Sequence, residues 1–233
     1  MKIYLPLLLL NCLILSAQED NLEWLKTEES DSLYREDQFY FGFTFNFLTR
    51  LPNEVEQSGF SGGLSLGFIR DIPVNKRRNL ALGLGLGINL DTYGQTLLID
   101  DSASSTSFTA IGEDSNYDIN RFNTHIVEIP IELRWRSSDV NKYAFWRVYL
   151  GVDFGYLFHF KSNFTSQNQK LLSTDQSLLN SFSTNIKLTF GYGAINFSVK
   201  ANLIPLFNDQ QIDGSGESIN IQPIKAGLVF FFL

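Results

Sequence analysis

Cysteine is nearly absent from this chain of 233 residues, and histidine is scarce. The one cysteine, Cys12, lies in an apolar N-terminal stretch that is expected to be removed, so the mature chain would have no disulfide and no thiol nucleophile. A lipid anchor on Cys12 is a weaker alternative, because Asn11 is a poor residue before a lipidated cysteine and apolar residues continue beyond it.

Long apolar runs are also missing beyond the N-terminus. Met1 and Lys2 precede an apolar stretch at residues 3–15 and a small-residue cleavage site, Ser16-Ala17-Gln18. These features predict a signal peptide over residues 1–17, whose apolar part is too short for a transmembrane helix. No later stretch approaches the ~18 consecutive apolar residues that such a helix requires. We therefore expect an exported mature chain without a membrane-spanning helix.

Positive charge is in short supply. The chain has 18 Lys and Arg against 25 Asp and Glu, a formal net charge of −7, and loss of Lys2 with the signal peptide makes it −8. An acidic chain repels the phosphate backbone, so nucleic acid is not an expected partner. Residues 18–38 are acidic and lack strand alternation, which predicts a periplasmic N-terminal segment before the folded domain.

What the chain does contain is strict alternation of side chains. In residues 80–90 a Leu or Ile occupies every even position, and Ala, Gly or Asn every odd one. A period of two predicts a strand with one apolar face. Glycine weakens an ordinary strand, so Gly83, Gly85 and Gly87 on the other face indicate a tightly curved sheet with little room inside. The length is close to the ~9–11 residues of a membrane-spanning strand.

The same alternation recurs along the rest of the chain, and the connections between the alternating segments are short and long in turn. This pattern is typical of an up-and-down transmembrane barrel with short periplasmic turns and longer outer loops. We therefore predict an all-β, eight-stranded antiparallel barrel over residues 39–233, in the outer membrane of a Gram-negative bacterium, with both termini periplasmic. The predicted strands are residues 39–47, 60–70, 80–90, 121–136, 144–158, 182–190, 195–203 and 221–233.

Two points of this barrel stay open from the pattern alone. The last strand ends in Phe230-Phe231-Phe232-Leu233 and is apolar on both faces, so its facing is ambiguous. A soluble lipocalin-like barrel would also have eight strands, with apolar residues inside and polar ones outside. The export signal, the row of five Phe at residues 39–47 and the loop alternation favour the membrane barrel.

Charged residues of both signs fall on the predicted inner face, where a lumen of eight strands is filled by its own side chains. The expected arrangement is a mutually neutralising plug. Its predicted members are Glu128, Glu132, Arg134, Arg136, Arg147, Asp153, Lys187, Lys200 and Lys225. An aromatic girdle is predicted from Trp135 and Trp146 at the periplasmic edge and from Tyr156 and Phe158 at the outer edge.

Motifs for catalysis or cofactor binding are lacking. His125 and His159 are expected at exposed outer ends of strands, and neither nucleophile-elbow nor HExxH spacing accompanies them. The glycines of residues 83–87 do not form a phosphate-binding loop, and the acidic stretch at residues 99–118 lacks calcium-loop spacing, so we expect a solvated loop there. The sequence predicts no enzyme, cofactor, metal site or small-molecule substrate.

Four segments resemble the PorT family of outer-membrane barrels in Bacteroidetes: residues 34–40 (YREDQFY), 67–73 (GFIRDIP), 128–136 (EIPIELRWR) and 145–149 (FWRVY). The resemblance implies a non-enzymatic component of the type IX secretion system, needed for cargo export and, in gliding motility, for delivery of surface adhesins. Partners would be outer-membrane lipid and other envelope or secretion-system proteins, with the Trp135/Trp146 turn and the acidic segment as contact surfaces. A generic barrel with an adhesive or structural role through its outer loops is the alternative.

Overall fold

The computed structural model describes residues 37–75, 77, 79–102, 105–112, 115–137 and 146–232. The predicted signal peptide and nearly all of the predicted acidic segment lie outside them. No α-helix occurs in these ranges, and no helix there is long and apolar enough to cross a membrane. The elements in chain order are β1 (Gln38–Thr49), β2 (Gly62–Pro73), β3 (Leu80–Gly94), β4 (Leu97–Asp100), β5 (Ser107–Ala110), β6 (Ile119–Arg136), β7 (Trp146–Thr165), β8 (Lys170–Ser173), the 3₁₀ turn η3 (Gln176–Leu178), β9 (Phe182–Tyr192), β10 (Ile195–Asn202) and β11 (Gln222–Phe232).

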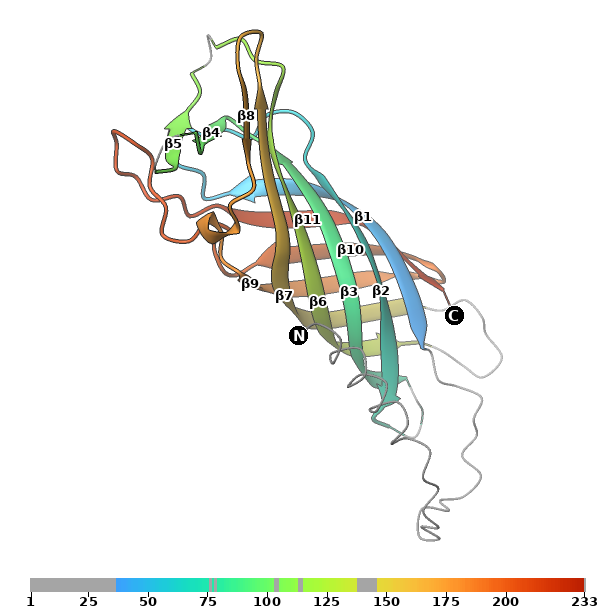
Figure 1. The fold of residues 1–233 in the computed structure, drawn as a ribbon. Helices are drawn as coiled ribbons and strands as arrows, with labels where there is room; N and C mark the ends of the chain where they lie inside the picture. The colour runs from blue at the N-terminus through green and yellow to red at the C-terminus, as the bar shows by residue number, and fades with distance from the viewer. Residues whose placement is uncertain are drawn as a thin grey trace, which may run out of the picture. The chain divides into compact units, whose positions relative to one another are not determined.

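Eight of these strands form one closed antiparallel barrel (Figure 1). Their order around the barrel is β6-β3-β2-β1-β11-β10-β9-β7, and β6 pairs with β7 to close the ring. All eight predicted strands are present, so the predicted all-β, eight-stranded architecture is confirmed. Pro130 falls inside β6, and no pairing of β6 with β3 occurs between Gly87↔Glu128 and Leu84↔Ile131, as expected for a residue without an N–H.

The barrel wall is apolar outside and polar inside. All five Phe of β1 are exposed on the outer face, while Asn46 of the same strand is buried. This facing is opposite to that of a lipocalin and excludes the soluble alternative. The structure also shows which way the last strand faces: Phe232 is 53% exposed on the outer face, whereas Phe231 is 7% exposed and packs inside the barrel.

The glycines of β2 and β3 make room for large side chains that cross the narrow lumen. A Cβ added at Gly87 would collide with the hydroxyl of Tyr40, and one at Gly67 would lie 2.6 Å from the Tyr40 ring. At Gly83 it would lie 2.7 Å from Cδ of Arg134. The glycine-rich alternation of β3 therefore reflects a lumen with no space for a methyl group at these positions.

The two ends of the barrel differ. At one end, here called the turn end, are the connections β2–β3, β6–β7 and β9–β10. At the other, here called the cap end, the four longer connections join the inner faces of the strands in an apolar core, and β4, β5 and β8 lie there together (Figure 1). That core, here called the cap, consists of Leu48, Val55, Tyr93, Leu97, Ile99, Phe108, Phe122, Ile126, Leu157, Phe160, Leu178, Leu179, Leu206, Phe207, Ile212, Ile219 and Ile221.

The cap corrects the expectation of solvated loops. The predicted polar loop between the third and fourth strands contains the β4–β5 hairpin, whose Ile99 and Phe108 are each 2% exposed. The strands also run further than predicted, β3 to Gly94 and β7 to Thr165. The sequence pattern did not reveal this core, because its residues come from different connections and strand ends and show no common period.

Candidate functional site

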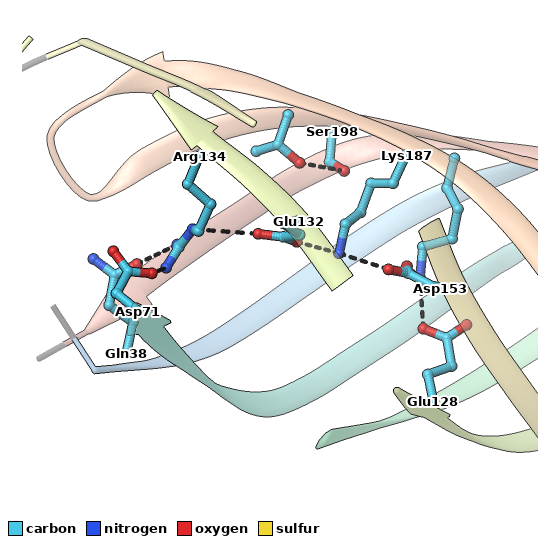
Figure 2. A network of polar contacts seen from close by, with 10 residues as sticks. Gln38, Asp71, Glu128, Glu132, Arg134, Asp153, Lys187 and Ser198 are labelled. Atoms are coloured by element: carbon cyan, nitrogen blue, oxygen red, sulfur yellow. Dashed lines mark hydrogen bonds and ion pairs between the residues drawn. The ribbon is translucent and has the colours of Figure 1, made fainter. Parts of the chain in front are cut away.

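The centre of the lumen is an ion-pair network built on Asp153 of β7, which is fully buried. One of its carboxylate oxygens lies 3.1 Å from Nζ of Lys187 and the other 2.7 Å from Nζ of Lys200. Lys187 also contacts Glu132 at 2.5 Å, and Lys200 contacts Glu128 at 2.7 Å. Figure 2 shows this chain of alternating charges crossing the lumen from β6 to β9. Each buried charge thus has partners of opposite sign, which burial requires.

The network continues to the turn end through Glu132. Nε of Arg134 lies 3.3 Å from a carboxylate oxygen of Glu132. Nη1 of Arg134 contacts Asp71, and Nη2 donates a hydrogen bond of 2.6 Å to Oε1 of Gln38 (Figure 2). Asp71 also contacts Arg136 at 2.7 Å.

The guanidinium of Arg134 is held by aromatic rings as well as by carboxylates. It lies 4.0 Å from the ring centroid of Tyr149 and 5.3 Å from that of Phe231. These two rings, with Tyr40, Ile69 and Val229, form a small buried cluster across the lumen. An aromatic layer therefore lies beside the charges at the turn end.

Two further contacts complete the lumen. Toward the cap end, Lys225 of β11 lies 2.5 Å from Asp91 of β3, which also accepts a hydrogen bond of 3.0 Å from Nδ2 of Asn46. At the turn end, Arg147 donates to the carbonyl of Gly193 in the β9–β10 turn. The structure therefore places all nine charged residues of the predicted lumen set inside the barrel.

Two acids of this network, Asp71 and Asp91, had no place in the sequence prediction. The predicted second and third strands end at residues 70 and 90, one residue before each of these acids. In the structure β2 and β3 extend through them, and their odd positions share the inner face with Ile69 and Asn89. Continuing the two-residue alternation past the last apolar residue would have found both.

The lumen is nearly neutral and filled. The carboxylates Asp71, Asp91, Glu128, Glu132 and Asp153 lie among six cationic side chains, those of Arg134, Arg136, Arg147, Lys187, Lys200 and Lys225. A cavity of about 40 Å³ lies between these charges and Tyr40, enough for only a few water molecules. The cap and the aromatic layer close the two sides of this region. The arrangement is that of a plug.

Aromatic side chains lie at both margins of the outer apolar face. Trp135 and Trp146 are exposed at the turn end, where the Trp146 ring meets Tyr192 at 5.6 Å between centroids. Tyr156 is exposed ten positions along β7 from Trp146 and meets Phe182 at 5.5 Å. At ~3.3 Å per residue and the ~40° tilt usual in barrels, this stretch spans ~25 Å, the height of a membrane band.

The two histidines lie together on the outer face. His125 of β6 pairs with His159 of β7, and their ring centroids are 4.7 Å apart. A register shift at His125/Ile126 makes Phe158 an extra residue in β7, so it and His159 both lie outward. Sequence reasoning had placed both histidines at strand ends but had no means of pairing them. Within the described residues, no three His, Cys, Asp or Glu are grouped to hold a metal ion.

The exposed apolar wall, the polar filled lumen and the aromatic margins are those of a barrel that spans a lipid bilayer. The family described as outer membrane protein beta-barrel domain matches residues 17–208. This chain belongs to that family. Its membership assigns the protein to the outer membrane. Among curated proteins, none matches this chain.

Proposed function

We propose that this outer-membrane barrel is a non-enzymatic component needed for protein export by the type IX secretion system. The resemblance of residues 34–40, 67–73, 128–136 and 145–149 to the PorT family supports this role. The observation that carries the mechanism is the filled lumen, whose ion pairs leave about 40 Å³ of free space. Cargo cannot pass through such a barrel, so it would act by contacting other envelope proteins.

The turn end is the proposed contact surface. In this proposal the turn end and both chain termini lie on the periplasmic side of the membrane. Trp146 is 58% exposed, Tyr192 lies against it, and Trp135 lies on the neighbouring strand. Exposed tryptophan and tyrosine are the side chains that most often carry binding energy between proteins. The acidic segment of residues 18–38 would add a charged surface on the same side of the membrane.

Deletion of the gene tests the secretion role. We expect cargo with type IX sorting domains to accumulate in the periplasm and to return to the surface on complementation, while outer-membrane integrity is retained. Normal cargo export in the deletion strain would refute the proposal.

Point variants then test the contact surface. Complementation with Trp135→Ala/Trp146→Ala is expected to restore barrel assembly but not export. The matched control is Tyr156→Ala/Phe158→Ala, which removes two exposed aromatic residues at the cap end of the apolar band and should restore both. Equal export by the two double variants would exclude the turn end as the contact surface. Charge reversal of residues 35–37 tests the acidic segment in the same assay.

A second candidate function is adhesion or envelope support through the cap, and the ordered core of the cap favours it. Four connections, one of which contains the β4–β5 hairpin, converge there on shared apolar side chains, which holds an outer surface in a defined shape. Replacement of residues 98–109 by a short Gly-Ser linker separates the two functions. Loss of adhesion with intact cargo export would support the second candidate.

A further inference from the structure

The outer face of β6 and β7 changes character near the cap end. From the turn end to Val127 of β6 and to Phe158 of β7, the outward side chains are largely apolar. The next three outward residues of each strand are polar or basic: Arg121, Asn123 and His125 on β6, and His159, Lys161 and Asn163 on β7. Since the two strands pair along this stretch, four basic side chains occupy one patch directly beside the apolar band.

The patch, here called the basic patch (Arg121, His125, His159 and Lys161), is concentrated by strand pairing. His125 lies opposite His159, and Asn123 lies opposite Lys161. Arg121 and Lys161 are both exposed, and no ion pair joins either of them to another of the described residues. In a chain of net charge −7, two exposed cations that no described carboxylate pairs with are available to an anionic ligand.

A recess in the outer wall adjoins the basic patch. It has a volume of about 600 Å³ and is walled by Phe45, Phe60, Leu64 and Leu90 on its apolar side. Its polar lining includes Thr92, Asn123 and His125, so one residue of the basic patch also lines the recess. The carboxylate of Asp91 borders the recess as well, and inside the wall it is paired with Lys225. An apolar hollow that opens beside Arg121 and Lys161, and whose one carboxylate is already paired with Lys225, matches an acyl chain joined to an anionic headgroup.

We propose that this surface binds one phosphorylated lipid of the surrounding membrane. An acyl chain lies in the recess, and Arg121 and Lys161 bind the lipid phosphate, with His125 and Asn123 between chain and headgroup. Guanidinium and ammonium groups form charge-assisted hydrogen bonds with phosphate oxygens, and low-dielectric lipid beside them strengthens the attraction. In the proposed orientation this is an outer-leaflet lipid. The site does not depend on the role in secretion.

Lipid binding by the purified mature chain in detergent tests the proposal. The probes are phosphorylated lipid A, the same lipid A after removal of its phosphates, and inorganic phosphate, with bound lipid counted by native mass spectrometry. The test variant is Arg121→Glu/Lys161→Glu. The matched control is Arg70→Glu/Lys170→Glu, which makes the same change of charge at two exposed residues outside the basic patch. Leu90→Trp fills the recess and leaves the charges unchanged.

The expected result is tight binding of phosphorylated lipid A that weakens about tenfold in Arg121→Glu/Lys161→Glu, since one or two charge-assisted contacts are lost. Leu90→Trp should also weaken it, and the control should not. Three results would overturn the proposal: equal binding of the dephosphorylated lipid, an equal loss in the control, or competition by inorganic phosphate at the lipid's concentration, which would indicate an anion site without an acyl chain. Barrel folding in each variant is checked by its heat-dependent gel mobility.

Discussion

The interior of this barrel has two halves of opposite chemistry. Midway along the strands the inward side chains are Glu, Asp, Lys and Arg joined in ion pairs, whereas at the cap end they are Phe, Leu and Ile in an apolar core. β6 contains both halves, with Phe122 and Ile126 buried in the cap and Glu128 and Glu132 buried in the network, all on one inner face.

The medium outside the wall explains the difference. Where the wall faces lipid, apolar side chains are stable outside, so the polar half of the alternation lies inside and must be paired there. Where the wall leaves the membrane, water surrounds it, and the apolar half is buried inside as in a soluble protein. The inversion of the pattern along β6 and β7 therefore marks the edge of the membrane.

The largest effect is expected where the polar half loses its central charge. Asp153→Asn leaves Lys187 and Lys200 close together in the lumen with one carboxylate each. Breaking a buried pair commonly costs ~3–5 kcal/mol, so the free energy of unfolding should fall by about this amount. Urea unfolding in detergent micelles, followed by tryptophan fluorescence, measures it. Asp118→Asn, at an exposed position, is the control. Equal stability of the two variants would contradict the role of the network.

In the apolar half the matching change is Phe207→Ala. The Phe207 ring is buried and meets Phe108 and Phe122 at 5.9 and 5.7 Å between centroids. Its truncation should destabilise the cap by ~3 kcal/mol through lost contacts and a cavity. We expect faster proteolysis within residues 95–118 while the barrel stays folded. Phe45→Ala, on the lipid-facing wall, should leave the cap resistant, and an equal effect of both would argue that cap and barrel unfold together.

A smaller effect is expected at the glycine face of β3. Gly87→Ala places a methyl group against the hydroxyl of Tyr40, and such overpacking costs ~1–3 kcal/mol. Tyr40→Phe removes the hydroxyl and should restore part of the lost stability in the double variant. A double-mutant cycle on unfolding free energies measures this coupling. If the two losses of unfolding free energy simply add, contact with the Tyr40 hydroxyl is not what destabilises Gly87→Ala.

The smallest effect concerns acid in the cap. Hydrogen bonds from the side chain and backbone N–H of Ser102 lower the pKa of Asp100. The pKa of Asp100 is lower in the folded state than in the unfolded state. Its contribution to cap stability is therefore fully present at a pH above the unfolded-state pKa and is lost as the pH falls through the folded-state pKa. NMR titration should show the depressed pKa of Asp100. The cap of the unsubstituted protein should lose a little stability below about pH 4, and in Asp100→Asn this acid-dependent loss should be absent. An unchanged acid profile in the variant would refute this contribution.

Much of this structure could be predicted from the sequence. The parts that could not be predicted share one cause. The Leu/Gly alternation of β3 and the charged alternation of β6 predicted strands and facing, because side chains in a strand point to opposite faces regardless of context. The cap was missed because its residues, such as Ile99 and Phe108 in one connection and Phe207 in another, show no common period along the chain. The pairing of His125 with His159 and the position of Asp71 likewise depended on register and strand length.

The sequence by itself determined the eight strands, the inner and outer faces of the first seven and their order as an up-and-down barrel, since a two-residue period and alternating loop lengths are local properties of the chain. Only the tertiary structure decided which charges meet, how the last strand faces and that the long connections share one core. Those outcomes depend on closure of the ring, which brings β6 against β7 and sets every contact across the lumen.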